Sequence, residues 1–146
     1  MICDFQFTYD AAGNRKTILE DTGARVTWSY DSIYQLIDDN RSGTNAYRRT
    51  FTYDSVGNCL VKDVGGSLAT STFDGGDQLI NVQDSTGFTT YAFDANGNQS
   101  LVVSPTGNRT TSTWGYENQI ELVNLPNGNL VTSSYDADNF RVSHVI

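Results

Sequence analysis

The sequence predicts an all-β protein whose tandem β-hairpins form one continuous, curved or spiralling antiparallel sheet. Three observations support this prediction: an aromatic–aspartate pair that returns every 20 to 23 residues, alternation of aromatic and polar residues before the pair, and a glycine-bearing turn after it. A constant period of this size is typical of one supersecondary unit stacked on copies of itself. No stretch shows the i, i+3, i+4, i+7 apolar spacing of an amphipathic helix.

The aromatic residue of each pair, called the anchor below, defines the units. The pairs are Tyr9-Asp10, Tyr30-Asp31, Tyr53-Asp54, Phe73-Asp74, Phe93-Asp94 and Tyr135-Asp136, and Trp114-Gly115 stands where a further pair is due. No linker, charge block or low-complexity segment interrupts the series. We therefore predict a single repeat array over residues 1–146, in which the recurring aspartates are structural residues.

The first strand of each unit ends at the anchor. An aromatic residue precedes the anchor by two positions in several units, as Phe7, Trp28, Phe51 and Tyr91 do, with a small residue between the two. This alternation predicts a half-buried strand, and strands in register would align the aromatic residues in columns. We expect these columns to pack as a core; exposed columns would instead suit sugar rings.

A turn follows the aspartate. In three units it ends in Gly-Asn, at Gly13-Asn14, Gly57-Asn58 and Gly97-Asn98. These glycines are expected to have positive φ, which a tight hairpin turn demands. The aspartate before each turn can accept hydrogen bonds from the N–H groups of the turn backbone.

A second strand completes each unit. Its aliphatic residues are Ile18-Leu19, Leu36-Ile37, Leu60-Val61, Leu79-Ile80, Leu101-Val102-Val103, Leu122-Val123 and Val142, and a loop with a glycine reverses the chain again. Each unit is thus one β-hairpin, and about fourteen short strands are expected.

Two types of unit alternate. Units of the first type carry Gly-Asn, whereas the second type has Gln and an aliphatic residue at the fifth and sixth positions after the anchor: Gln35-Leu36, Gln78-Leu79 and Gln119-Ile120. The last unit, anchored at Tyr135, is due to be of the first type. It reads Asp136-Ala137-Asp138-Asn139, and we expect Asp138 to replace the glycine.

Composition limits the partners. The formal net charge of −8 and the absence of a basic stripe argue against nucleic acid and against insertion into, or binding at, a membrane surface. The first residues lack the basic start and apolar stretch of a secretion signal. Cys3 and Cys59 are expected to be packed thiols, with a disulfide between them as the alternative.

No catalytic, cofactor or metal residues are predicted. Carboxylate pairs occur at Asp38-Asp39, Asp74/Asp77 and Asp136/Asp138, but repeated aspartates at equivalent positions form a column rather than facing each other across a cleft. His144 is the only histidine, and we expect it at a frayed terminus. The segment Asp94–Asn98 resembles the start of a calcium loop without its bidentate glutamate, so a turn is the favoured interpretation and weak calcium binding the alternative.

The units resemble the YD repeat of the RHS family. The resemblance is closest at Phe51-Thr-Tyr-Asp-Ser-Val-Gly-Asn58, Phe93-Asp-Ala-Asn-Gly-Asn98 and Trp114-Gly-Tyr-Glu-Asn-Gln-Ile120, and it extends from Phe5 to Val142. The family includes bacterial polymorphic toxins, the C components of toxin complexes and the teneurins. Membership implies a sheet that spirals into a hollow shell, an extracellular or cell-surface location, and no enzymatic activity in the repeats themselves.

Two departures from the toxin members stand out. This sequence has no Asp-Pro, whereas many toxin members carry an Asp-Pro-rich segment for self-cleavage, and its seven units are too few to close a shell of the usual size. The expected function is a structural scaffold, a segment of a shell, wall or self-assembling fibre. The alternative is a carbohydrate-binding adhesion module that contacts glycans through exposed aromatic residues.

Self-association is the partner prediction. Strand edges in the terminal units would offer unpaired backbone groups to another chain, and a second copy placed after Ile146 would continue the spacing of the anchors. We therefore expect a head-to-tail homo-oligomer or filament, or association with the rest of a larger RHS protein.

Overall fold

The structure, a computed structural model, describes residues 5–146 and contains fourteen β-strands in that range. They are β1 (Gln6–Tyr9), β2 (Arg15–Leu19), β3 (Arg25–Tyr30), β4 (Leu36–Arg41), β5 (Tyr47–Tyr53), β6 (Cys59–Val64), β7 (Ser67–Phe73), β8 (Leu79–Asp84), β9 (Gly87–Phe93), β10 (Gln99–Val103), β11 (Arg109–Trp114), β12 (Ile120–Asn124), β13 (Leu130–Tyr135) and β14 (Arg141–Val145). No helix in this range is long and apolar enough to cross a membrane.

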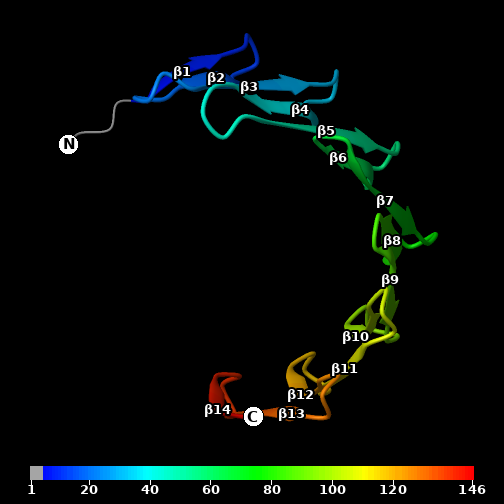
Figure 1. The fold of residues 1–146 in the computed structure, drawn as a ribbon. Helices are drawn as coiled ribbons and strands as arrows, with labels where there is room; N and C mark the ends of the chain where they lie inside the picture. Colours follow the sequence, from blue (N-terminus) through cyan, green and yellow to red (C-terminus); the bar gives the residue numbers. More distant parts are fainter. Residues whose placement is uncertain (1–4) are drawn as a thin grey trace. The chain divides into compact units, whose positions relative to one another are not determined.

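The strands follow one another in a single antiparallel sheet, in the order β1 to β14 (Figure 1). The prediction of an all-β fold made of consecutive hairpins is confirmed. The chain divides into two compact units, Met1–Thr70 and Ser71–Ile146, with the division inside β7. The prediction of a single array over the whole chain stays a prediction.

In the compact unit that ends at Thr70, the two faces of the sheet carry different side chains. Trp28 of β3 lies opposite Asp39 of β4, which lies opposite Arg49 of β5, so these residues share the face of the anchors. On the other face Thr8 is paired with Thr17, and their hydroxyl oxygens are 2.7 Å apart. The alternation in the sequence thus places the aromatic residues on one face, which here also carries Asp39 and Arg49, and hydroxyl groups on the other.

The core is thin because nothing packs on the anchor face within the described residues. Among their apolar side chains only Ala24 and Val26 are buried, with 3% and 5% of their surface exposed. The anchors after the first are half-buried, whereas Tyr9 is 57% exposed. The aromatic columns therefore form neither a closed core nor an open platform.

A β-bulge interrupts six of the hairpins just before the turn. The anchor and the residue before it pair with two residues that have one extra residue between them. The extra residues are Lys16, Ile37, Leu60, Ser100, Glu121 and Val142. Such bulges bend the strand and increase its twist.

Candidate functional site

The seven turns that follow the anchors share one backbone geometry. In each, the N–H of the residue after the anchor donates to the carbonyl oxygen four residues later, at 2.8–3.0 Å. The N–H of the fourth residue after the anchor donates to the backbone carbonyl oxygen of the first residue after the anchor, at 3.0–3.3 Å. These recurring turns are the part of the molecule in which functional side chains are positioned most regularly.

Six of the turns contain an aspartate whose side chain caps the turn. One carboxylate oxygen of each aspartate accepts two backbone N–H groups, two and four residues further on, at 2.8–3.0 Å. The side-chain amide of Asn14 lowers the pKa of Asp10, and the Asn98 N–H does the same for the pKa of Asp94. These carboxylates are used within their own turns.

The fourth residue after every anchor has a left-handed backbone. Its φ is positive in all seven turns: Gly13 (88), Tyr34 (67), Gly57 (101), Asp77 (61), Gly97 (84), Asn118 (56) and Asn139 (67). The predicted positive φ of the three glycines is confirmed. The prediction that Asp138 replaces the glycine of the last unit is wrong: Asn139 occupies that place, because Asn tolerates the left-handed region better than most residues.

Side-chain amides connect successive turns. The Asn98 side-chain amide donates to the Asn118 side-chain oxygen at 2.8 Å, and the Gln119 side-chain amide donates to the Asn139 side-chain oxygen at 2.8 Å. In both cases the fifth residue after one anchor contacts the fourth residue after the next. We call this series of contacts the amide ladder. It gives Asn98 and Gln119, both at the fifth position, a partner in the next turn.

The polar tips of the anchors connect neighbouring units in a second way. The hydroxyl groups of Tyr30, Tyr53 and Tyr135 donate to backbone carbonyl oxygens 15 or 17 residues earlier, at 2.8–3.0 Å, and the Trp114 indole N–H does so at 2.9 Å. Each acceptor carbonyl belongs to the first residue of a second strand, beside a bulge. Sequence reasoning missed this contact, although the presence of Tyr or Trp rather than Phe at five of the seven anchors was a signal.

The turn without an aspartate contains Gly115. A Cβ atom at Gly115 would lie 2.5 Å from an oxygen of the Glu121 carboxylate. Glu121, which is the bulge residue of that hairpin, therefore fills the space that an aspartate side chain occupies in the other turns.

The adjacent carboxylates Asp38 and Asp39 lie on opposite faces and cannot act on one substrate together. Asp38 forms an ion pair with Arg48 at 3.0 Å, and Asp39 forms one with Arg49 at 3.4 Å. Asp39 is 7% exposed and also accepts a 3.3 Å hydrogen bond from the Tyr47 hydroxyl group. Burial, followed by the charge of Asp39, raises the pKa of Tyr47.

Other candidates from the sequence have ordinary surroundings. His144 is paired with Ser133 in β14, rather than frayed as expected. The Asp94 carboxylate is occupied by Asn96 and Asn98 in its turn, and the described residues contain no cluster of three potential metal ligands. Cys3 lies outside the described residues; Cys59 is half-buried, and burial raises the pKa of its thiol group.

The fold is similar to parts of solved toxin structures. Two crystal structures of TcdB2-TccC3 assemblies, one titled with TEV and one with Cdc42, match 96% of this chain with TM-scores of 0.59, at 15% and 18% identity. The Tc holotoxin pore of Photorhabdus luminescens matches 96% of it with a TM-score of 0.58, at 16% identity. The chain has an RHS-like repeat fold.

The RHS-like segment spans only a small part of those proteins. It covers 11%, 7% and 11% of the matched chains, respectively. No family model matches the sequence, and no curated protein matches it either. At these identities the likeness concerns the fold alone.

Proposed function

We propose that this chain is a non-enzymatic structural scaffold, a segment of the wall of an RHS-like shell or of a self-assembling fibre. The observation that supports it best is that the recurring side chains are used to hold the repeat together. Aspartates cap turns, anchor tips donate to carbonyl groups of the neighbouring unit, and amides connect turn to turn. Groups engaged in this way leave few acids or bases for chemistry.

The tandem hairpins also suit growth by addition of strands. In the described sheet β1 is paired with β2 alone and β14 with β13 alone, so each offers one row of backbone groups to a further strand. That strand is supplied by more of an RHS protein or by a second copy in head-to-tail contact, which makes a filament if the contact does not close. An extracellular or cell-surface location belongs to this proposal.

The aromatic columns support the carbohydrate-binding alternative less well than the scaffold proposal. Apart from the exposed Phe7 and Tyr9, the anchors and the aromatic residues before them are half-buried. The polar tips of four anchors, Tyr30, Tyr53, Trp114 and Tyr135, are engaged by carbonyl groups of the neighbouring unit. A sugar-binding role is therefore not assigned to the columns.

The scaffold proposal is tested by proline substitutions at adjacent positions of β14, Ser143→Pro and His144→Pro. Successive N–H groups of a strand point to opposite sides, so one of the two prolines blocks the open edge and the other breaks the pairing with β13. We expect the unmodified chain to associate in light scattering and electron microscopy. One proline variant should stay folded by circular dichroism and become monomeric, whereas an unmodified chain that is monomeric at high concentration would contradict self-assembly.

A further inference from the structure

Neighbouring repeat units pair with each other in one constant register. In the six such pairings of the described sheet, the eighth residue after one anchor lies opposite the third residue before the next anchor. The pairs are Thr17 with Thr27, Asp38 with Thr50, Val61 with Thr70, Asn81 with Thr90, Leu101 with Thr111 and Leu122 with Thr132. The register stays the same although the joining loops differ in length, from two residues between β6 and β7 to five between β2 and β3. It is therefore a property of the strands, and a strand that no loop connects can adopt it.

The contacts of the anchor tips follow the same rule. Each anchor with a polar tip and a preceding unit donates to the carbonyl oxygen of the sixth residue after the preceding anchor, at 2.8–3.0 Å. The donors are Tyr30, Tyr53, Trp114 and Tyr135, and the acceptors are Arg15, Leu36, Gln99 and Ile120, respectively. This hydrogen bond thus accompanies the register and connects one unit to the next.

Tyr9 is an anchor with a polar tip and no preceding unit within the described residues. Its side chain is 57% exposed, whereas the later anchors are half-buried. In β14 the equivalent acceptor is the carbonyl oxygen of Arg141, the sixth residue after Tyr135, and no described anchor follows it. The Tyr9 hydroxyl group and the Arg141 carbonyl group are therefore the donor and the acceptor of the contact that recurs between units.

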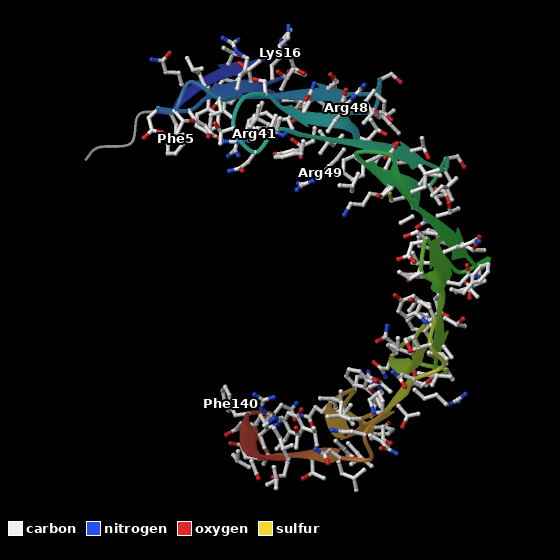
Figure 2. All side chains as sticks on the ribbon, in the orientation of Figure 1. Phe5, Lys16, Arg41, Arg48, Arg49 and Phe140 are labelled. Carbon is white, nitrogen blue, oxygen red and sulfur yellow. The ribbon has the colours of Figure 1, made fainter. Side chains whose placement is uncertain are left out.

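The two edge strands are also the most exposed strands of the described sheet. All residues of β1 and of β14 are exposed, whereas each strand between them contains half-buried or buried residues. The exposed side chains include Val142 and Val145 of β14, and Phe5 and Phe140 directly before the two strands (Figure 2). Neither strand contains the Pro or Lys that commonly protects an open edge. Both edges thus have the composition of surfaces that pair with a further strand.

We propose that β14 of one copy pairs with β1 of the next copy in the register of the repeat, so that Ser143 lies opposite Gln6 and the Tyr9 hydroxyl group donates to the Arg141 carbonyl oxygen. This inference rests on the self-assembly proposed above and names the contact through which one copy recognises the next. β1 contains no charged side chain, so Arg141 meets no like charge across the junction. The junction between copies then has the same register and the same hydrogen bond as the junctions within the chain.

Paired cysteines in the full chain test the register. Cys3 and Cys59 are first replaced by Ser, and this background should associate as the unmodified chain does. Gln6→Cys with Ser143→Cys, and Phe5→Cys with His144→Cys, then place thiol groups at adjacent pairs of the expected ladder. Adjacent pairs alternate between close and wide Cα separation, so at least one variant should form a disulfide between copies on mild oxidation. Covalent multimers on non-reducing electrophoresis are the expected result.

The matched controls move one cysteine by two residues, which keeps its side chain on the same face. Gln6→Cys is combined with Arg141→Cys or with Val145→Cys, and few multimers are expected from either combination. Multimers that form mainly through position 141 or 145 would show another register. That result, or a disulfide within one chain, would overturn this inference, whereas multimers in any register would leave the proposed self-assembly in place.

Tyr9→Phe tests the hydrogen bond. The variant keeps the aromatic ring, and Phe73 and Phe93 are already anchors of other units, so the fold should be retained. The critical concentration for association, read by light scattering, should rise about three- to tenfold. Tyr116→Phe is the control, because it removes an exposed hydroxyl group from a turn outside both edge strands and should change nothing. Equal association of Tyr9→Phe and the unmodified chain would overturn the contact alone, whereas an unmodified chain that stays monomeric would overturn the self-assembly as well.

Discussion

The turns at residues 31–35 and 115–119 occupy the same place in the second type of unit, one in each half of the chain. Both have the same pair of backbone hydrogen bonds, both end in Gln, and both hold their fourth post-anchor residue at positive φ. Their side chains nevertheless differ at the other four positions, and two of these differences concern the turn contacts. Asp31 and Tyr34 in the first turn correspond to Gly115 and Asn118 in the second.

The difference separates what the backbone requires from what the side chains add. The turn forms with or without the aspartate, since Gly115 makes the same backbone bonds as Asp31. At the left-handed position Asn118 accepts the Asn98 amide with little strain, whereas Tyr34 is a bulky residue in the same strained conformation. The first turn thus combines a strained backbone position with an exposed aromatic ring, and the second does not.

The largest loss of stability is expected from a substitution that does not fit the left-handed backbone conformation shared by the turns. Gly57, with φ 101, holds the left-handed position of another turn, and a Cβ there would lie 3.2 Å from the Gln35 amide nitrogen. Gly57→Val should lower the free energy of unfolding by about 2–3 kcal/mol, because a β-branched residue strains this conformation. Denaturant unfolding measures the loss, and Gly57→Asn is the matched control.

Gly57→Asn should lose much less, because Asn already occupies the position in two turns. Equal losses for Val and Asn would show that the left-handed backbone is not the shared requirement.

Exchanging the side chains of the two compared turns should move stability in opposite directions. Asn118→Tyr removes the acceptor of the Asn96 and Asn98 amides and adds left-handed strain, so a loss of about 2 kcal/mol is expected. Tyr34→Asn should add about 1 kcal/mol, or roughly 3 °C in melting temperature. Calorimetry of both variants checks the exchange, and a destabilised Tyr34→Asn would mean that Tyr34 supports the fold.

Gly115 offers a smaller test of why one turn lacks an aspartate. Gly115→Asp alone should change stability little, because the new side chain must displace the flexible carboxylate of Glu121. Combined with Glu121→Ala, the same aspartate should stabilise the turn by about 1 kcal/mol through its backbone N–H groups. A double-mutant cycle measures the coupling, and strictly additive effects would separate Glu121 from the turn.

Much of the architecture can be predicted from the sequence, because the features that determine it recur. The period, the alternation before each anchor and the glycines at Gly13, Gly57 and Gly97 lead to fourteen strands and to positive φ. The bulges cannot be predicted in this way. An extra residue such as Lys16 or Ile37 has no characteristic composition and becomes visible only in the register.

The left-handed turn at Tyr34 was missed for a related reason. Ile33 and Tyr34 look like strand residues, and nothing in their chemistry indicates a left-handed turn. The available signal was positional, since aligning all units on the anchor places Tyr34 where the others have Gly, Asn or Asp. The same alignment would have placed Asn139, rather than Asp138, at the glycine position.

The smallest expected effect distinguishes two neighbouring turns by their response to acid. The N–H and the side-chain amide of Asn98 lower the pKa of Asp94 below its usual 3.8, whereas Gly115 has no group to titrate. A depressed pKa in the folded state means that the stabilisation is present above pH 3.8 and is lost as the pH falls through the lower, folded value. Amide exchange, corrected for its intrinsic pH dependence, should therefore show that residues 94–98 lose protection below pH 3.8 while residues 115–119 change less. Asp94→Asn keeps an acceptor oxygen but does not ionise, so it should remove this pH dependence; parallel loss in both turns of the unmodified chain would assign the acid response to the sheet as a whole.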